Sequence, residues 1–260
     1  MDCIKCGKCI DVCSSAAKPL TMTDEGVKVN IEGCNACGHC VAICPVDALE
    51  HPLSPIQPLC GEPVDADTAE KFLRYARSVR YYKDELIEPE KLTRLLTMGT
   101  YALTGSNRQG IRYAVINGRE KIQDLVTLFC GEAEKFCPEN PDIQWLMPRV
   151  EHYRATGEDQ IFRHCTTLIV AIGPDDLNHR KNAYFSCTFM SLMAPSLGIG
   201  TCWAGMYETL ASNPNFDGAF RKAFGVKEGE AIHAILMAGV PDVKFRRFAA
   251  RNPLDVTYLD

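Results

Sequence analysis

Two short runs of closely spaced cysteines near the start of the chain constrain its fold more than any other feature. Both runs have the spacing C-x2-C-x2-C-x3-C. They consist of Cys3, Cys6, Cys9 and Cys13, and of Cys34, Cys37, Cys40 and Cys44. A tight loop with a thiolate at every third residue can bind three corners of an iron–sulfur cube, and the fourth ligand must come from elsewhere in space. The runs therefore predict two [4Fe-4S] clusters.

Zinc and disulfides are the alternative uses of these cysteines. Paired C-x2-C motifs also suit tetrahedral zinc, but zinc sites rarely have a third cysteine at the same short interval. Disulfides are disfavoured in the reducing cytoplasm that we expect for this chain. That expectation rests on the first residues, MDCIK, which lack the apolar run of a secretory signal.

The cysteine-rich segment resembles a bacterial two-cluster ferredoxin over residues 1–50. The resemblance rests on the two runs, on Gly7, Gly33 and Gly38, and on the sequence CPVDAL that begins at Cys44. In such ferredoxins the fourth cysteine of each run binds the other cluster. The resemblance thus implies two crossed ligand sets, Cys3, Cys6, Cys9 and Cys44 for the first cluster and Cys34, Cys37, Cys40 and Cys13 for the second.

A proline-rich stretch separates this segment from the rest of the chain. Residues 51–65 contain four prolines, which favour an extended linker over a helix or a strand. Beyond it, helical and strand patterns are interspersed, with helices expected from residue 66, from Pro89 and over 183–197, and strands over 113–116, 167–172 and 232–238. We expect an α+β chain with a ferredoxin-like module at 1–50, a linker at 51–65 and a second domain at 66–260.

Charge and hydropathy argue against two classes of partner. The 260 residues carry a formal charge of −5, which disfavours a protein that binds nucleic acid through phosphate contacts. Residues 182–207 have no charged side chain and are long enough to cross a bilayer, but they include Pro195, three glycines and several hydroxyl residues. We therefore expect no membrane partner, and we expect this stretch to lie in a core or a subunit interface.

Four separate segments of the second domain could contact one anionic, planar ligand. They are Arg77, Ser78 and Arg80; Thr104, Gly105, Ser106, Asn107 and Gln109; Trp203, Ala204 and Gly205; and Lys244 and Arg246. Arginine forks bind phosphate, and a glycine-containing polar turn can approach a flat ring closely. Each segment alone is also typical of a solvated surface, a polar loop, a helix end or a basic tail.

Taken together, in order and spacing, the four segments resemble the FMN-dependent nitroreductase superfamily over residues 70–250. The shared features are Arg-Ser-x-Arg, a polar turn about thirty residues later, Leu-Gly-x-Gly-x-x-Trp, and Lys-x-Arg after Gly-x-Pro. The resemblance implies an α+β homodimer with FMN in its interface, contacted by both chains. Ala76, Leu103 and Gly110 depart from residues common in the family, which leaves the substrate side of the site open.

The resemblance also implies a role for each segment. Arg77 and Ser78 belong to the first FMN-contacting set, and Arg80 lies at the pyrimidine edge as an electrostatic tuner. The turn at 104–109 is the second set. The backbone of 203–205 donates a hydrogen bond to the flavin N5, and the 244–246 tail grips the phosphate.

The two modules together predict an iron–sulfur flavoprotein oxidoreductase that needs no protein nucleophile. Clusters pass single electrons, whereas reduced FMN gives two as a hydride from N5. We expect reduction of a small conjugated, nitroaromatic or quinone-type acceptor, with ferredoxin or NAD(P)H as external donor. The alternatives are an electron-transfer flavoprotein that serves a protein partner and a flavin-dependent reductive dehalogenase.

Overall fold

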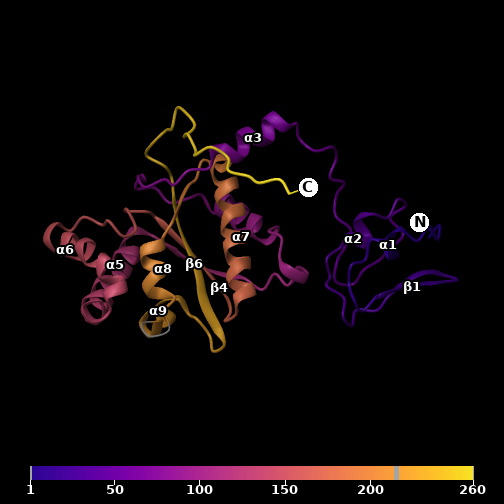
Figure 1. The fold of residues 1–260 in the computed structure, drawn as a ribbon, viewed down its shortest axis with the longest axis horizontal. Coiled ribbons are helices and arrows are strands. Elements are labelled where there is room, and N and C mark those ends of the chain that lie inside the picture. The colour runs from indigo at the N-terminus through magenta and orange to yellow at the C-terminus, as the bar shows by residue number, and fades with distance from the viewer. Residues whose placement is uncertain (1, 214–216, 260) are drawn as a thin grey trace. The chain divides into compact units, whose positions relative to one another are not determined.

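The structure is a computed structural model that describes residues 2–213 and 217–259. The chain divides into two compact units (Figure 1). The first runs to Val64 and also includes Leu103–Gln109, and the second comprises Asp65–Ala102 and the chain from Gly110 onward. Residues 51–65 form neither helix nor strand. The domain limits at residues 50 and 65 stay predictions.

The first unit combines a two-stranded antiparallel sheet with one-turn helices. The sheet pairs β1 (Leu20–Thr23) with β2 (Gly26–Val29), and the helices are α1 (Lys8–Asp11) and α2 (His39–Ala42). Its buried apolar core, among the described residues, consists of Leu20, Cys40, Val41 and Leu49. Because so small a core contributes little stability, bound clusters must supply much of it.

The second unit is built on a four-stranded antiparallel sheet of order β3-β4-β6-β5. Its strands are β3 (Arg112–Asn117), β4 (Thr167–Pro174), β5 (Gly200–Trp203) and β6 (Glu230–Gly239). Three of these were predicted, each slightly shorter than found. The prediction missed β5, which is short and begins with a glycine. The α+β class is confirmed.

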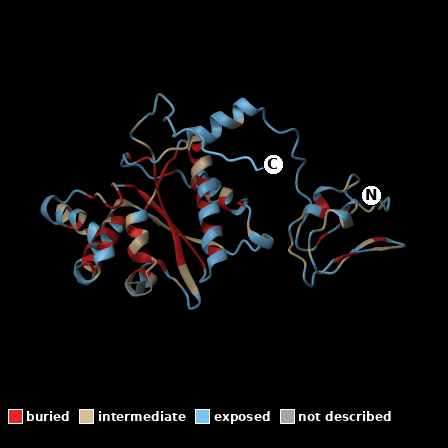
Figure 2. Ribbon diagram, viewed as in Figure 1, coloured by how far each residue is buried: buried red, intermediate tan, exposed pale blue. Residues whose placement is uncertain are grey.

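Helices cover both faces of this sheet, and β4 contributes to both resulting cores (Figure 2). Leu168 and Val170 face a core shared with α5 (Arg119–Phe136), α6 (Met147–Thr156), α8 (Gly205–Ala211) and α9 (Asp217–Phe224). Ile169 and Ala171 face a second core shared with α4 (Pro89–Thr100) and α7 (Leu177–Met193). This double burial explains why β4 is almost uniformly apolar.

The helix predicted over 183–197 begins and ends earlier than predicted, and its first turns include Arg180 and Lys181. Asp176 caps α7 by accepting hydrogen bonds from the backbone of Asn178 and His179, so the helix starts in a polar turn. Pro195 lies in the following 3-10 turn, η4 (Ala194–Leu197), which ends at Gly198 with φ of 71°. No helix within the described ranges is both long and apolar enough to cross a membrane.

In the described part of the chain, the remaining elements are one α-helix and three short 3-10 segments. The helix is α3 (Ala66–Tyr75), which begins at the N-cap Asp65. The 3-10 segments are η1 (Gly105–Asn107), η2 (Cys137–Glu139) and η3 (Pro141–Leu146).

Candidate functional site

Four of the predicted cluster ligands line one cavity of the first unit. They are Cys13, Cys34, Cys37 and Cys40. The structure thus brings one cysteine of the first run together with three of the second, as the crossed set requires. No three His, Cys, Asp or Glu side chains of residues 2–213 and 218–259 converge as they would around a single ion. The ligands of a cube bind four different iron atoms and need not converge on one point.

Three ligands of the other set are also neighbours. Burial is the main cause that raises the pKa of the Cys9 thiol, and the nearby thiols of Cys3 and Cys44 raise it further. Cys6 lies exposed on the same loop. Cys44 therefore reaches the cysteines of the first run, and its sulfur also accepts a hydrogen bond from the Ala48 amide at 3.3 Å.

His51 is a buried neighbour of the second ligand set that the sequence reasoning missed. Its side chain is 6% exposed, and its Nε2 lies 3.4 Å from the sulfur of Cys34. Its Nδ1 accepts a hydrogen bond from the Leu53 amide at 3.1 Å. Because a ring nitrogen that accepts carries no proton, the proton lies on Nε2 and is donated to the sulfur. His39 has a comparable position 3.5 Å from Cys37, but both of those residues are exposed.

The predicted polar turn at 104–109 belongs to the first unit. The Asn107 amide donates to the carbonyl oxygens of Ala36 at 2.9 Å and of Asn35 at 3.2 Å. Ala36 has φ of 49°, and its carbonyl also accepts from the Ser54 hydroxyl at 2.9 Å. Asn107 therefore holds the backbone between two predicted cluster ligands. The FMN-contacting role of Thr104, Gly105, Ser106, Asn107 and Gln109 stays a prediction.

In the second unit, the segment 77–83 is hydrogen-bonded on both sides. Its Val79 amide donates to the carbonyl of Thr201 in β5 at 2.9 Å. Its Lys83 amide donates to the carbonyl of Val240, just beyond β6, also at 2.9 Å. The predicted Arg77, Ser78 and Arg80 therefore sit on a backbone fixed by the sheet.

Two glycines allow this close approach. A Cβ on Gly200 would lie 2.7 Å from Val79, and one on Gly239 would lie 2.8 Å from the Tyr82 ring. The Tyr82 hydroxyl donates to the Val79 carbonyl at 2.6 Å. Burial raises the pKa of Tyr82 far above its usual range, so the hydroxyl keeps the proton that it donates.

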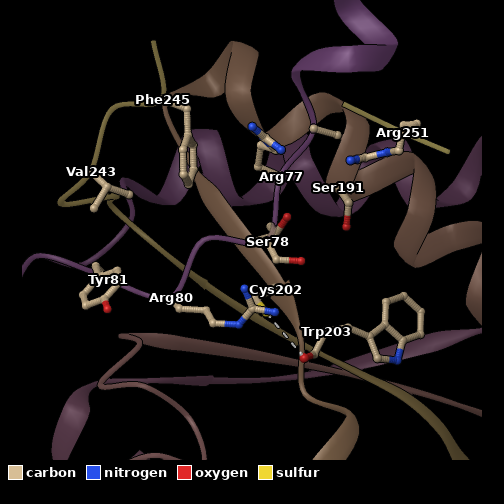
Figure 3. Close-up of a pocket in the computed structure, with 12 residues that line it drawn as sticks. Arg77, Ser78, Arg80, Tyr81, Ser191, Cys202, Trp203, Val243, Phe245 and Arg251 are labelled. Carbon is tan, nitrogen blue, oxygen red and sulfur yellow. Dashed lines mark hydrogen bonds between the residues drawn. The ribbon is translucent and has the colours of Figure 1, made fainter. Parts of the chain in front are cut away.

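Three adjoining cavities form one cleft along β5, which we call the β5 cleft. The central cavity, of about 730 Å³, is lined among others by Arg77, Ser78, Arg80 and Trp203 (Figure 3). A cavity of about 120 Å³ shares Arg77 with it and adds Lys244. A third, of about 340 Å³, shares Arg80 and Trp203 and adds Ala204 and Gly205. Arg246 is exposed and lines none of the three.

The central cavity is basic. Arg77, Arg80 and Arg251 line it, and none of its lining residues in the described part of the chain is acidic. The Arg77 guanidinium lies 5.2 Å from the centre of the Phe245 ring and donates to the Arg247 carbonyl at 3.3 Å. Both the volume and the charge suit an anionic ligand of cofactor size.

Glu208 supports Trp203 and was also missed by the sequence reasoning. Its carboxylate accepts hydrogen bonds from the Trp203 indole at 3.0 Å, the Tyr184 hydroxyl at 3.2 Å and the Ile235 amide at 3.3 Å. Burial raises the pKa of Glu208, and these donors counter that shift in part. One carboxylate thus fixes the indole against α7 and β6.

We expect Gly200→Ala to displace the segment 77–83, because the added Cβ would overlap Val79. Such overpacking costs about 1–3 kcal/mol. Thermal unfolding followed by circular dichroism should show a lower Tm. Gly131→Ala in α5 is the matched control, since its Cβ meets no atom within 4 Å. An unchanged Tm for Gly200→Ala would contradict the close approach.

We expect Glu208→Ala to destabilise the second unit by about 1–3 kcal/mol, because the half-buried indole N–H loses its acceptor. Glu208→Gln keeps an acceptor oxygen and should retain most of that stability. Urea unfolding of both variants measures the difference. Equal losses in the two variants would show that the hydrogen bonds of Glu208 are not what stabilises this region.

The comparisons with known proteins agree with this geometry. Residues 73–240 match the family model described as Nitroreductase family, and residues 1–45 match a 4Fe-4S dicluster domain. No curated protein matches the chain significantly.

Several solved structures share the fold. A nitroreductase with bound FMN from Bacteroides fragilis is 20% identical, with a TM-score of 0.58 over 74% of this chain and 98% of that one. A nitroreductase with bound FMN from Desulfitobacterium hafniense is 20% identical, with a TM-score of 0.56 over 74% and 97%. A BluB-like flavoprotein from Clostridium difficile is 14% identical, with a TM-score of 0.56 over 74% and 99%. Since the nitroreductase model matches more than half of the sequence, the chain belongs to the nitroreductase family.

Proposed function

We propose that this chain is an iron–sulfur flavoprotein oxidoreductase whose β5 cleft binds FMN and whose two [4Fe-4S] clusters supply it with electrons. The observation that carries the proposal is the basic central cavity beside the segment 77–83. Two of the solved structures that share the fold are described as having FMN bound. The dicluster match over residues 1–45 supports the iron–sulfur half of the proposal.

The residues of the cleft fit the parts of FMN. Arg77 and Lys244 line the same cavity, so we assign the phosphate to that end, with Arg246 beside it. Arg80 and Trp203 line both the central cavity and the third one, so we assign the ring to the end of the central cavity that adjoins the third.

One backbone amide suits the reactive edge of the ring. The Ala204 amide already donates to the Ile235 carbonyl at 2.9 Å. We therefore assign the hydrogen bond to the flavin N5 to Gly205, the first residue of α8, whose amide has no acceptor within the helix.

The electron flow joins two kinds of carrier. FMN, when bound, accepts single electrons and gives two together as a hydride from N5. Reduction of a nitro group to nitroso consumes two electrons and two protons and releases water, so it requires two deliveries from the clusters. Arg80 favours negative charge at the ring edge. We propose a ferredoxin or NAD(P)H as the external donor.

A second copy of the chain is the partner that we infer. The outward side of α7 exposes Tyr184, Phe185 and Phe189, with exposed fractions of 38%, 50% and 36%. The helix α3 has no buried residue, although it carries Phe72 and Leu73. Apolar surface of this extent is typical of a covered interface, and a homodimer would cover both helices.

One experiment separates this enzyme from the two alternatives. The reduced protein is freed of reductant and mixed, without oxygen, with a nitroaromatic or a quinone. We expect the oxidised flavin spectrum to return without any added protein. A carrier would need a protein partner for reoxidation, and a dehalogenase would respond to an aryl halide and release halide ion.

We expect the double substitution Lys244→Ala and Arg246→Ala to weaken FMN retention by about 1.5–3 kcal/mol for each charged hydrogen bond that is lost. Dialysis followed by flavin quantitation measures retention. Lys121→Ala, an exposed position on α5, serves as the control. Full flavin occupancy in the double variant would show that the phosphate binds elsewhere.

We expect His51→Leu to lower the midpoint potential of one cluster and leave the other unchanged. A hydrogen bond to a cluster sulfur favours the reduced, more negative cluster, so its loss lowers the potential. A redox titration followed by electron paramagnetic resonance measures both clusters. His39→Leu is the matched control, and its exposed contact should matter much less. Equal shifts in the two variants would refute a special role for the buried histidine.

A further inference from the structure

The third cavity of the β5 cleft has a wall rich in arginine, and we call it the Arg163 cavity. It has a volume of about 340 Å³ and shares Arg80 with the central cavity. Arg149 from α6 and Arg163 from the turn before β4 line it, together with Trp145, whose side chain is 47% exposed. None of its lining residues in the described ranges is acidic.

These three arginines lack a carboxylate partner. Within residues 2–213 and 218–259, no Asp or Glu oxygen lies within 4.0 Å of Arg80, Arg149 or Arg163. Elsewhere in the unit, the half-buried Arg112 is neutralised by Glu230, with Nε and Oε1 2.8 Å apart. Arg149 and Arg163 are also half-buried, and a half-buried charge without a counterion is unfavourable. Their guanidinium groups are therefore available to bind an anionic ligand.

The turn that carries Arg163 is held in a conformation that ordinary residues disfavour. Arg163 and His164 have φ of 57° and 54°. The carboxylate of Asp159, which is 3% exposed, accepts from the amides of Ile161 and Phe162 at 2.8 Å and of His164 at 3.0 Å. A buried side chain thus stabilises a costly turn, and such strain is typical of functional sites.

The Arg163 cavity lies where an electron acceptor would approach the reactive edge of the flavin. It contains Trp203, Ala204 and Gly205, the segment to which we assign the reactive edge of the flavin. An acceptor that reaches that edge would therefore lie against the arginines. The exposed Trp145 indole offers a flat apolar surface for an aromatic ring.

We propose that the Arg163 cavity binds a carboxylate of the electron acceptor, so that the acceptor is an anionic aromatic compound rather than a neutral one. Arg149 and Arg163 supply paired N–H donors for that carboxylate. This inference rests on the proposed function, because it places FMN in the adjoining central cavity.

The test compares two acceptors that differ chiefly in charge, 4-nitrobenzoate and 4-nitrobenzamide, with the FMN- and cluster-loaded protein. We expect kcat/KM to be at least about tenfold higher for the benzoate. Arg149→Gln and Arg163→Gln should each lower the benzoate value about tenfold and leave the amide value nearly unchanged. Arg94→Gln, at an exposed position of α4, is the control and should change neither value.

A binding measurement without turnover completes the test. Calorimetry with the oxidised, loaded protein should give a dissociation constant for 4-nitrobenzoate that rises about tenfold in each arginine variant. If neither compound is reduced, the proposed function fails. If the wild-type protein reduces both compounds with equal kcat/KM and binds them equally, the proposed function stands and the anionic-acceptor inference is overturned.

Discussion

The second unit depends on the backbone pairing of the segment 77–83 with β5 on one side and with the residues after β6 on the other. This pairing fixes the backbone that carries Arg77, Ser78 and Arg80, so these residues hold set positions along the β5 cleft. It is possible only because Gly200 and Gly239 leave room for Val79 and Tyr82. A site fixed before the ligand arrives loses less conformational entropy on binding, so the same arginines bind an anion more tightly.

The first unit depends on a different constraint, since its apolar core is too small to hold the fold alone. Its loops are arranged around the cysteines. The side chain of His51 bonds to the sulfur of Cys34, and the side chain of Asn107 bonds to the carbonyl of Ala36. The peptide links on both sides of Leu103–Gln109 continue into the second unit. Leu103–Gln109 thus belongs to the first unit by its hydrogen bonds, although its neighbours in the sequence belong to the second.

Local patterns were predictable and distant pairings were not. Cysteine spacing is a local signal that predicted the two runs, whereas the grouping of Cys13 with the second run was implied by the resemblance to two-cluster ferredoxins. The strands β4 and β6 are buried on both faces, so their sequences are continuous apolar runs, and such runs predict buried strands. In contrast, β5 is short and starts with glycine, and His51, Glu208 and Arg163 are single residues whose partners come from other elements. No spacing rule identifies such residues; only the fold does.

The central claim is that one chain holds both inorganic clusters and a flavin, and cofactor analysis of the anaerobically purified protein tests it most directly. The account predicts about eight iron atoms, about eight acid-labile sulfides and about one FMN for each chain, with a visible spectrum that contains both chromophores. Zinc in place of iron, or iron without any flavin, would contradict it.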